Sequence, residues 1–493
     1  MLNNLMLVGT GSDVGKSILA TAFCRIFRQD GYNPAPFKAQ NMALNSFVTP
    51  DGLEIGRAQA VQAEAAGVPC HTDMNPLLLK PQSDHTSQVI LNGRPLGTSS
   101  AYDYFRRSGR EELRREVCAA FDRLKTRHSP IVMEGAGSIS EINLRDSDIV
   151  NMPMALHAGA DVILVGDIDR GGVFASVYGS LALLRPHERA LIKGIIINKF
   201  RGDIRLFEPG VKMMEDLCRL PVLGVIPYYN NIHIEEEDSV SLAAKAMRTE
   251  RGKVNVAVVL LRHISNFTDF DSLERDPRIH LFYTNNTTEL TRADIIIIPG
   301  SKSTIDDLSE LRRNGTAQAI LQSHRNGTTI LGICGGYQMM GREVLDPQHV
   351  EGETERMPGL GLLPVSTTLD SHKVTRRTRF SKDGTWMEGY EIHCGQTVPT
   401  PGEQPTPLFI KEDGTPDGCH VSDRCMGTYI HGCLDNPWFV DHLLKPFKTK
   451  LSEAKNFDYH QFKEEQYDLL AAHVRANVNM QLIYEILTSK GKT

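Results

Sequence analysis

The sequence predicts an α/β protein built from two doubly wound domains. In the first half, short apolar runs alternate with amphipathic stretches, and this alternation favours a parallel sheet flanked by helices. Several of the runs are continuously apolar, which is typical of strands covered on both faces. The alternation stops in a polar, charged stretch near residues 228–253 and then begins again. A chain of 493 residues is also too long for one ordinary core.

Six apolar runs in the first half are expected to form one sheet. They are Leu5–Val8, Pro36–Ala39, Ile131–Glu134, Asp161–Gly166, Gly194–Asn198 and Val222–Ile226. The segments between them, such as Glu111–Lys125, have the spacing of amphipathic helices. We therefore expect a first domain over residues 1–230 and a linker over residues 231–252.

The second half repeats the pattern and predicts an α/β domain over residues 253–445. Its expected strands are Val254–Leu261, Ile279–Tyr283, Asp294–Pro299 and Thr328–Ile333. Between residues 365 and 425 the pattern changes to short strand-like pieces with turn residues, which favours antiparallel pairing. A C-terminal extension over residues 446–493 is expected to hold one packing helix, because five apolar residues recur at helical spacing. They are Leu470, Val474, Val478, Leu482 and Ile486.

Composition is that of an ordinary globular protein, with 41% hydrophobic and 23% charged residues. A net charge of −6 gives no general attraction to nucleic acid or to anionic membranes. The apolar N-terminal residues indicate a strand rather than a signal sequence, and nine scattered cysteines fit a reducing compartment, so we expect a cytoplasmic protein. The cysteines and histidines between residues 393 and 433 match no common zinc spacing. The oligomeric state is not indicated.

The stretch GTGSDVGKS lies between the first apolar run and a helical segment. Backbone N–H groups and the helix N-terminus at such a turn hold phosphate, with Lys16 on the terminal phosphates and the Ser17 hydroxyl on Mg²⁺. Five residues rather than the usual four separate Gly9 from Gly15, but no chemical group is lost. We predict a nucleotide site formed by Thr10, Gly11, Ser12, Asp13, Val14, Gly15, Lys16 and Ser17.

Polar residues follow other strands of the first half at the same edge of the predicted sheet. Glu134 ends the run IVME, either as a ligand of Mg²⁺ or as a carboxylate that caps a turn. Asn198 ends another run, either as a partner of a nucleobase or as a turn residue. The stretch PFKAQNMALNS suits a substrate that bears carboxylates or amides, although a solvated loop explains it equally well. Its substrate-binding candidates are Lys38, Gln40, Asn41 and Asn45.

The stretch TTILGICGGYQMMG predicts a nucleophile elbow in the second half. An apolar run leads into Cys334, two glycines and a helical segment, so a tight turn exposes the thiol at a helix N-terminus. Backbone N–H groups of Gly300, Ser301 and Gly335 are candidate oxyanion donors. His431 in TYIHGCLDNP is the candidate base, because a nucleophilic cysteine needs one.

These motifs resemble known families. LGICGGYQMMG and YIHGC resemble the glutaminase domain of class I (triad-type) glutamine amidotransferases, which is flavodoxin-like. GTGSDVGKS and MEGAG resemble dethiobiotin synthetase and the enzymes that amidate cobyrinic acid. KAQNMALNS, EINLRDSDIVNM and GDIDRGGVFAS resemble the cobyric acid synthase family, and this similarity extends over nearly the whole chain.

The resemblance implies that Cys334 is the nucleophile and His431 its general base. It also implies ATP and Mg²⁺ as cofactors, glutamine as ammonia donor, and a small corrinoid substrate, adenosylcobyrinic acid a,c-diamide, amidated at its four remaining propionate-type side chains. The residues support the same chemistry, because a glutaminase that releases ammonia beside an ATP site indicates formation of a C–N bond through an acyl phosphate. Two alternatives stay open: an amidase that makes the a,c-diamide itself, and a non-catalytic P-loop regulatory switch.

Two departures from the related families bear on the sites. Most class I glutaminases carry a carboxylate two residues after the histidine, where this chain has Cys433; Asp435 is nearby in sequence, and the group that orients His431 is left open. A second acidic metal ligand of dethiobiotin synthetase aligns with Arg57, which leaves Glu54 as a candidate beside Ser17 and Glu134.

Overall fold

The structure, a computed structural model, describes residues 2–81, 86–100, 110–229, 231–235, 249–250, 252–450 and 457–488. Two compact units make up the chain. The first consists of Met1–Ala43, Glu54–Ile234 and Phe462–Thr493, and the second of Leu44–Leu53 and Glu235–Gln461. Most of the expected linker lies outside the described residues. Within the described part, no helix has the length and apolar character needed to cross a membrane.

The first unit is organised around one six-stranded sheet, ordered β12-β11-β10-β1-β9-β2, in which neighbouring strands are parallel. Its strands are β1 Leu5–Gly9, β2 Ala35–Phe37, β9 Ile131–Glu134, β10 Asp161–Asp167, β11 Ile192–Phe200 and β12 Val222–Pro227. All six predicted strands are therefore present in one sheet. Because the strands are parallel, their carboxyl ends lie along one edge.

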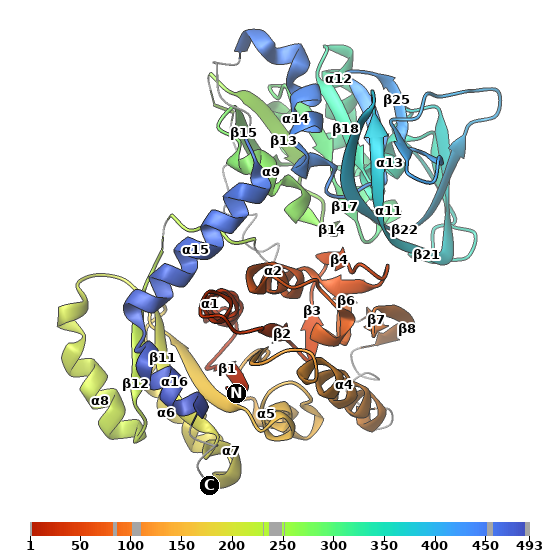
Figure 1. The fold of residues 1–493 in the computed structure, drawn as a ribbon. Helices are drawn as coiled ribbons and strands as arrows, with labels where there is room; N and C mark the ends of the chain where they lie inside the picture. The colour runs from red at the N-terminus through yellow and green to blue at the C-terminus, as the bar shows by residue number, and fades with distance from the viewer. Residues whose placement is uncertain are drawn as a thin grey trace. The chain divides into compact units, whose positions relative to one another are not determined.

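Helices cover both faces of this sheet (Figure 1). They are α1 Lys16–Gln29, α2 Arg57–Ala66, α4 Arg110–Lys125, α5 Met152–Ala158, α6 Val173–Leu183, α7 Pro186–Arg189 and α8 Glu208–Cys218. One core cluster joins α1 to the sheet through Phe23, Leu7 and Ile163, all fully buried. A second sheet, ordered β3-β6-β7-β8, adds β3 Gln40–Met42, β6 Leu77–Pro81, β7 Thr86–Leu91 and β8 Arg94–Ser100.

The C-terminal tail packs on the same core as two helices, α15 Tyr459–Asn477 and α16 Met480–Thr488. The prediction of one continuous helix is wrong at Val478, where the backbone leaves the helix and forms a bridge with Gly224 of β12. A side chain at Gly224 would lie 2.3 Å from the Asn477 carbonyl oxygen, so the close approach requires glycine there. The apolar spacing continues across this break, which explains why the sequence pattern does not show it.

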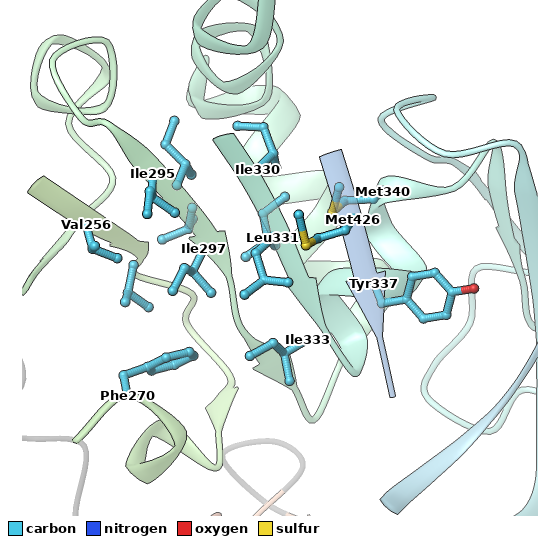
Figure 2. Packing of buried hydrophobic residues seen from close by; sticks show 14 of the residues in the cluster. Val256, Phe270, Ile295, Ile297, Ile330, Leu331, Ile333, Tyr337, Met340 and Met426 are labelled. Carbon is cyan, nitrogen blue, oxygen red and sulfur yellow. The ribbon is translucent and has the colours of Figure 1, made fainter. Parts of the chain in front are cut away.

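The second unit contains a six-stranded sheet ordered β15-β13-β16-β18-β26-β25, parallel except for the last pair. Its strands are β13 Val254–Val259, β15 Ile279–Thr284, β16 Ile295–Ile298, β18 Thr329–Ile333, β25 Cys419–Ser422 and β26 Cys425–Thr428. Figure 2 shows Ile295 and Ile297 of β16 beside Ile330, Leu331 and Ile333 of β18 in the core. The surrounding helices are α9 Asp271–Arg275, α10 Thr287–Leu290, α11 Thr304–Arg313, α12 Thr316–Arg325, α13 Gly335–Met340 and α14 Pro437–Leu444.

A long hairpin, β21 Val365–Lys382 and β22 Thr385–Pro399, replaces the short strands expected after residue 365. The antiparallel pairing was predicted. The short lengths are wrong for the hairpin, whose strands have 18 and 15 residues, and are confirmed after residue 400, where the strands have 2 to 4 residues. Bulges and polar residues interrupt the apolar alternation between Leu369 and Val374, so a single strand looks like two. Shorter strands of this part are β14 Ile264–Ser265, β17 Gly300–Ser301, β19 Glu343–Leu345, β20 Arg356–Pro358, β23 Phe409–Lys411 and β24 Pro416–Asp417.

The packing of the tail predicts that Leu470→Ala destabilises the first unit. Leu470 of α15 is 1% exposed within the core cluster, so truncation should cost about 2–5 kcal/mol of unfolding free energy. Leu469→Ala is the matched control, because that neighbouring side chain is 50% exposed. Urea unfolding should show a lower midpoint for Leu470→Ala alone; equal midpoints for both variants would contradict the packing described.

Candidate functional site

Cys334 occupies a strained turn between β18 and α13. Its φ of 53° is left-handed, a conformation that side chains other than glycine adopt only at an energetic cost of about 1–3 kcal/mol. The glycines that follow are required by space: a Cβ on Gly336 would lie 1.9 Å from the carbonyl oxygen of Ile298. This is the predicted nucleophile elbow, and its thiol is buried, 7% exposed, with Sγ 3.5 Å from the Ile392 carbonyl oxygen.

The three candidate oxyanion donors lie around the same turn. A Cβ built on Gly335 would be 2.8 Å from the backbone nitrogen of Ser301. A Cβ on Gly300 would be 3.5 Å from Cε1 of His431. The structure therefore brings Gly300, Ser301 and Gly335 together near the cysteine and the histidine, although the donor role itself stays a prediction.

His431 is oriented by Asp269, a residue that the sequence analysis missed. Asp269 Oδ2 lies 2.6 Å from His431 Nδ1, and its Oδ1 accepts a hydrogen bond from the backbone N–H of Gly432 at 3.2 Å. Both side chains are buried, at 1% and 3% exposure. Asp269 belongs to the short helix η5 Phe267–Phe270, 162 residues before the histidine in sequence.

The orienting carboxylate thus comes from another part of the second unit. Cys433, at the position where relatives carry a carboxylate, is a buried thiol whose pKa is raised by burial and by the nearby Asp269 charge. Asp435 donates its backbone N–H to the Gly432 carbonyl in the following turn. The one sequence signal for Asp269 was an acidic pair in NFTDFDS after β13, and nothing local linked it to His431.

The electrostatics of this group favour a charged histidine. Burial disfavours the imidazolium, but the charges and hydrogen bonds of Asp269 and Cys334 outweigh it and raise the pKa of His431 to about 10. With Nδ1–H on the Asp269 carboxylate, Nε2 is the atom that accepts or returns a proton. The arrangement of thiol, imidazole and carboxylate is that of a nucleophile, its base and the group that orients the base.

The glycine-rich loop of the first unit is closed by contacts from its own lysine. Lys16 Nζ donates to the carbonyl oxygens of Gly11, at 2.9 Å, and Gly137, at 3.0 Å. Gly15 at the start of α1 has a φ of 97°, and a Cβ there would lie 2.1 Å from Asn198 Nδ2, so only glycine fits. The loop follows β1 and precedes α1 as predicted.

Two predicted loop residues and Asn198 have defined partners. The Thr10 N–H donates to the Val165 carbonyl of β10 at 3.0 Å. This bond extends the pairing of β1 with β10 by one residue, so the Thr10 N–H is directed to the sheet and not to the phosphate site. Asn198, 4% exposed, donates from Nδ2 to the Val14 carbonyl at 2.9 Å and so anchors the loop to the end of β11. A nucleobase partner for Asn198 stays a prediction.

Glu134 is the centre of a buried polar cluster at the end of β9. Its Oε1 accepts from the Ser17 hydroxyl at 2.7 Å and lies 3.0 Å from Lys38 Nζ, while Oε2 accepts from Gln62 Nε2 at 2.9 Å. Burial raises the pKa of Glu134, but Lys38 and these hydrogen bonds outweigh it, and the net shift is downward. A serine hydroxyl beside an ionised carboxylate is a donor set that suits a hard divalent cation.

The other candidate residues separate into different surroundings. Glu54 is fully buried against Lys80, with 2.8 Å between Oε1 and Nζ. Asn41 donates to Gln59 Oε1 at 3.0 Å, and Gln40 opens β3. Asn45 lies in the second unit and accepts a hydrogen bond from the Phe267 N–H at 3.2 Å. The structure thus places Lys38 beside Glu134 and Asn45 near η5, rather than four side chains in one group.

Comparison with known proteins supports the assignment of both halves. Residues 5–242 match the model of the CobQ/CobB/MinD/ParA nucleotide binding domain, and residues 255–439 match the CobB/CobQ-like glutamine amidotransferase domain. A cobyric acid synthase from Bacteroides fragilis is 73% identical over 489 residues, which cover 99% of each chain. The chain belongs to the cobyric acid synthase family.

Further members of this family are similar over the same length. Cobyric acid synthases from Phocaeicola vulgatus and Parabacteroides distasonis are 68% and 56% identical, covering 99% and 98% of this chain and of theirs. The chain is accordingly an amide-forming enzyme that uses glutamine and a nucleotide. Lys16 lies in the region that matches the nucleotide binding domain, and Cys334 lies in the region that matches the glutamine amidotransferase domain.

The His431–Asp269 contact predicts a large loss of glutaminase activity in Asp269→Asn. We expect kcat to fall by about 10²- to 10⁴-fold, because the imidazole loses the carboxylate that fixes its orientation. The pKa of His431 should also fall, so the acid limb of the residual kcat–pH profile should move to lower pH, where neutral imidazole is then reached.

Asp435→Asn is the matched control for that variant, and it should keep kcat within a factor of about three, since the carboxylate that contacts Nδ1 of His431 is that of Asp269. Glutamate release from glutamine is the measurement. Equal losses in the two variants would contradict the role given to Asp269.

Proposed function

We propose that the protein amidates the four remaining propionate-type side chains of adenosylcobyrinic acid a,c-diamide to give adenosylcobyric acid, with ATP and with ammonia from glutamine. The observation that carries the proposal is the group of Cys334, His431 and Asp269 in one half of the chain. The other half holds a P-loop with Lys16 and Ser17, and the Ser17 hydroxyl contacts Glu134. One half supplies ammonia and the other activates a carboxylate.

In the glutaminase half, the Cys334 proton resides on His431 Nε2, and the thiolate attacks the carboxamide carbon of glutamine. The oxyanion that forms is stabilised by backbone N–H groups at the elbow, for which Gly335, Gly300 and Ser301 are the candidates. The imidazolium returns its proton to the leaving nitrogen, and ammonia departs. Water, activated by the same histidine, hydrolyses the thioester to glutamate and restores the thiol.

In the P-loop half, the substrate carboxylate attacks the γ-phosphorus of ATP and ADP leaves, which forms an acyl phosphate. The step is needed because the oxygen of a free carboxylate is too basic to be displaced by ammonia. Lys16 is the residue that would neutralise charge on the transferred phosphoryl group. Ammonia then attacks the acyl carbon, and inorganic phosphate leaves to give the amide.

The donor set behind the P-loop fits a magnesium ion. Ser17 and Glu134, whose side chains are in contact, would hold it, and Lys38 and Gln62 orient the carboxylate. When bound, the ion supplies positive charge to the phosphate oxygens. Both Glu134 and Glu54 pair with a lysine, but Glu134 also accepts a hydrogen bond from Ser17 of the P-loop, so Glu54 is the weaker candidate ligand.

The substrate brings its own cobalt, so no protein site for that metal is required. Nine cysteines scattered along the chain, without the spacing of a disulfide framework, support the proposal that the protein works in the reducing cytoplasm. The P-loop and the carboxyl end of β9 would contact the nucleotide. Among the substrate-binding candidates, Lys38 lies at this place, since it pairs with Glu134 at the end of β9.

Cys334→Ala tests the division of labour. We expect it to abolish amidation with glutamine and to retain amidation with added ammonium salt, because only the glutaminase step needs the thiol. Lys16→Ala should abolish both activities, since no carboxylate is then activated. Loss of both activities in a folded Cys334→Ala variant, or survival of both, would overturn the scheme.

Product masses test the substrate. With adenosylcobyrinic acid a,c-diamide, ATP and glutamine, mass spectrometry should show a final product with four added amides. Cobyrinic acid without amides is the control acceptor, and the a,c-diamide synthase-like alternative predicts two amides on it and no reaction with the diamide. A regulatory switch would release no glutamate with either acceptor.

A further inference from the structure

A short piece of the N-terminal half of the chain belongs structurally to the glutaminase unit. This inserted segment, Leu44–Leu53, lies between β3 and β5 Glu54–Gly56, both of which belong to the first unit. Asn45, Ser46 and Val48 are each at most 1% exposed, so the segment is packed rather than draped on a surface. Its contacts within the second unit converge on His431 from two sides.

The first side is the turn that carries Asn266. The Ser46 N–H donates to Asn266 Oδ1 at 3.0 Å, and the Asn45 side chain accepts from the Phe267 N–H at 3.2 Å. Asn266 has a φ of 51°, in the left-handed region that non-glycine residues adopt at a cost. Two hydrogen bonds with the inserted segment therefore hold the left-handed turn immediately before η5.

That turn places two side chains on the imidazole of His431. Asp269 takes Nδ1, and Asn266 Nδ2 lies 3.5 Å from Nε2. When the imidazole is neutral and Nδ1–H donates to the carboxylate, Nε2 carries the lone pair, and the Asn266 amide N–H is the donor nearest to it. The same four-residue stretch thus faces both ring nitrogens.

The second side is the face of the ring. Tyr390 of β22 stacks on His431 with 5.2 Å between ring centroids, and the two backbones exchange hydrogen bonds of 3.1 Å and 2.8 Å. Phe47 of the inserted segment packs edge-on against Tyr390 at 4.9 Å. Arg377 fixes the segment there, since its Nε donates to the Val48 carbonyl at 2.9 Å.

We propose that the inserted segment is a positioning element for the glutaminase base, with Asn266 as the positioning residue that acts on Nε2 of His431. The proposal rests on the proposed function, because it concerns the same glutaminase step. Asn45 and Ser46 set the Asn266 turn, and Phe47 sets the stacked tyrosine. The P-loop part of the chain thereby supplies structure on which the ammonia-releasing step depends.

The charge effect of Asn266 has a definite sign. An amide N–H aimed at Nε2 competes with the proton for the same lone pair, so it favours neutral imidazole. The titratable groups that face the ring are Asp269 from η5, Cys334 from the elbow and Tyr390 from β22. Removal of the amide leaves these in place and lets the proton bind more tightly.

Asn266→Ala is therefore expected to lower the glutaminase kcat by about 10- to 100-fold, as small displacements of a base do, while KM for glutamine changes by less than about twofold. The acid limb of the kcat–pH profile should move upward by about half a pH unit. This shift is opposite in sign to that expected for Asp269→Asn. A variant that only destabilised the fold would lower the fraction of active enzyme without shifting the kcat–pH profile.

A pair of variants in the inserted segment isolates its contribution. Asn45→Ala removes the acceptor for the Phe267 N–H and should reproduce the kcat loss and the pH shift; Asn45→Ser keeps a neutral acceptor oxygen and should restore part of kcat. Asn286→Ala, which removes an exposed helix cap in the same unit, is the control and should leave the pH profile unchanged.

Unchanged kcat and pH profile in Asn266→Ala would overturn the proposal, as would equal losses in Asn45→Ala and Asn45→Ser without a pH shift. Failure of the proposed function itself gives a different result. In that case the unaltered protein would release no glutamate from glutamine, whatever the state of the segment. Amidation with ammonium should be retained in Asn266→Ala, because Asn266 takes no part in carboxylate activation.

Discussion

The buried hydrogen bond between His431 and Asp269 is the interaction on which the glutaminase half depends. A carboxylate and an imidazole at 1–3% exposure tolerate charge only as a pair, so removing one partner would strand the other in a poor solvent. The rest of the site follows from where this pair is held: the elbow places Cys334 so that its side chain interacts with the imidazole, and η5 places Asp269 on Nδ1. The P-loop half shows the same logic, with Glu134 kept ionised by Lys38, Ser17 and Gln62.

Local pattern was enough to predict the scaffold and to single out the candidate reactive residues. Continuous apolar runs such as Ile131–Glu134 are buried on both faces of a parallel sheet, so their signal in the sequence is strong. The nucleophile elbow was equally recognisable. The space around Gly336 admits no side chain, so the motif requires a glycine at this position. The helix break at Val478 could not be recognised from the sequence, because the apolar residues on either side keep the same spacing.

The orienting carboxylate and the inserted segment were beyond sequence reasoning for one physical reason. Both are long-range contacts: Asp269 precedes His431 by 162 residues, and Asn45 precedes the turn that it holds by more than two hundred. Hydrophobic periodicity reports which face of an element is buried, but it carries no information about which distant element covers it. The sequence showed that polar residues such as Asn45 were unusual, but it did not show which residue Asn45 contacts.

The path of the chain through Leu44–Leu53 has a consequence for the history of such enzymes. Glutaminases and their synthetases can exist as separate polypeptides when each folds from a contiguous stretch, and a gene can then be divided at the linker. Here ten residues encoded within the ATP-binding half complete the other half. Division at the linker would leave the ammonia-producing part without those residues, so fission or exchange of partners would require that the segment be replaced at the same time. The fusion is in this sense difficult to reverse.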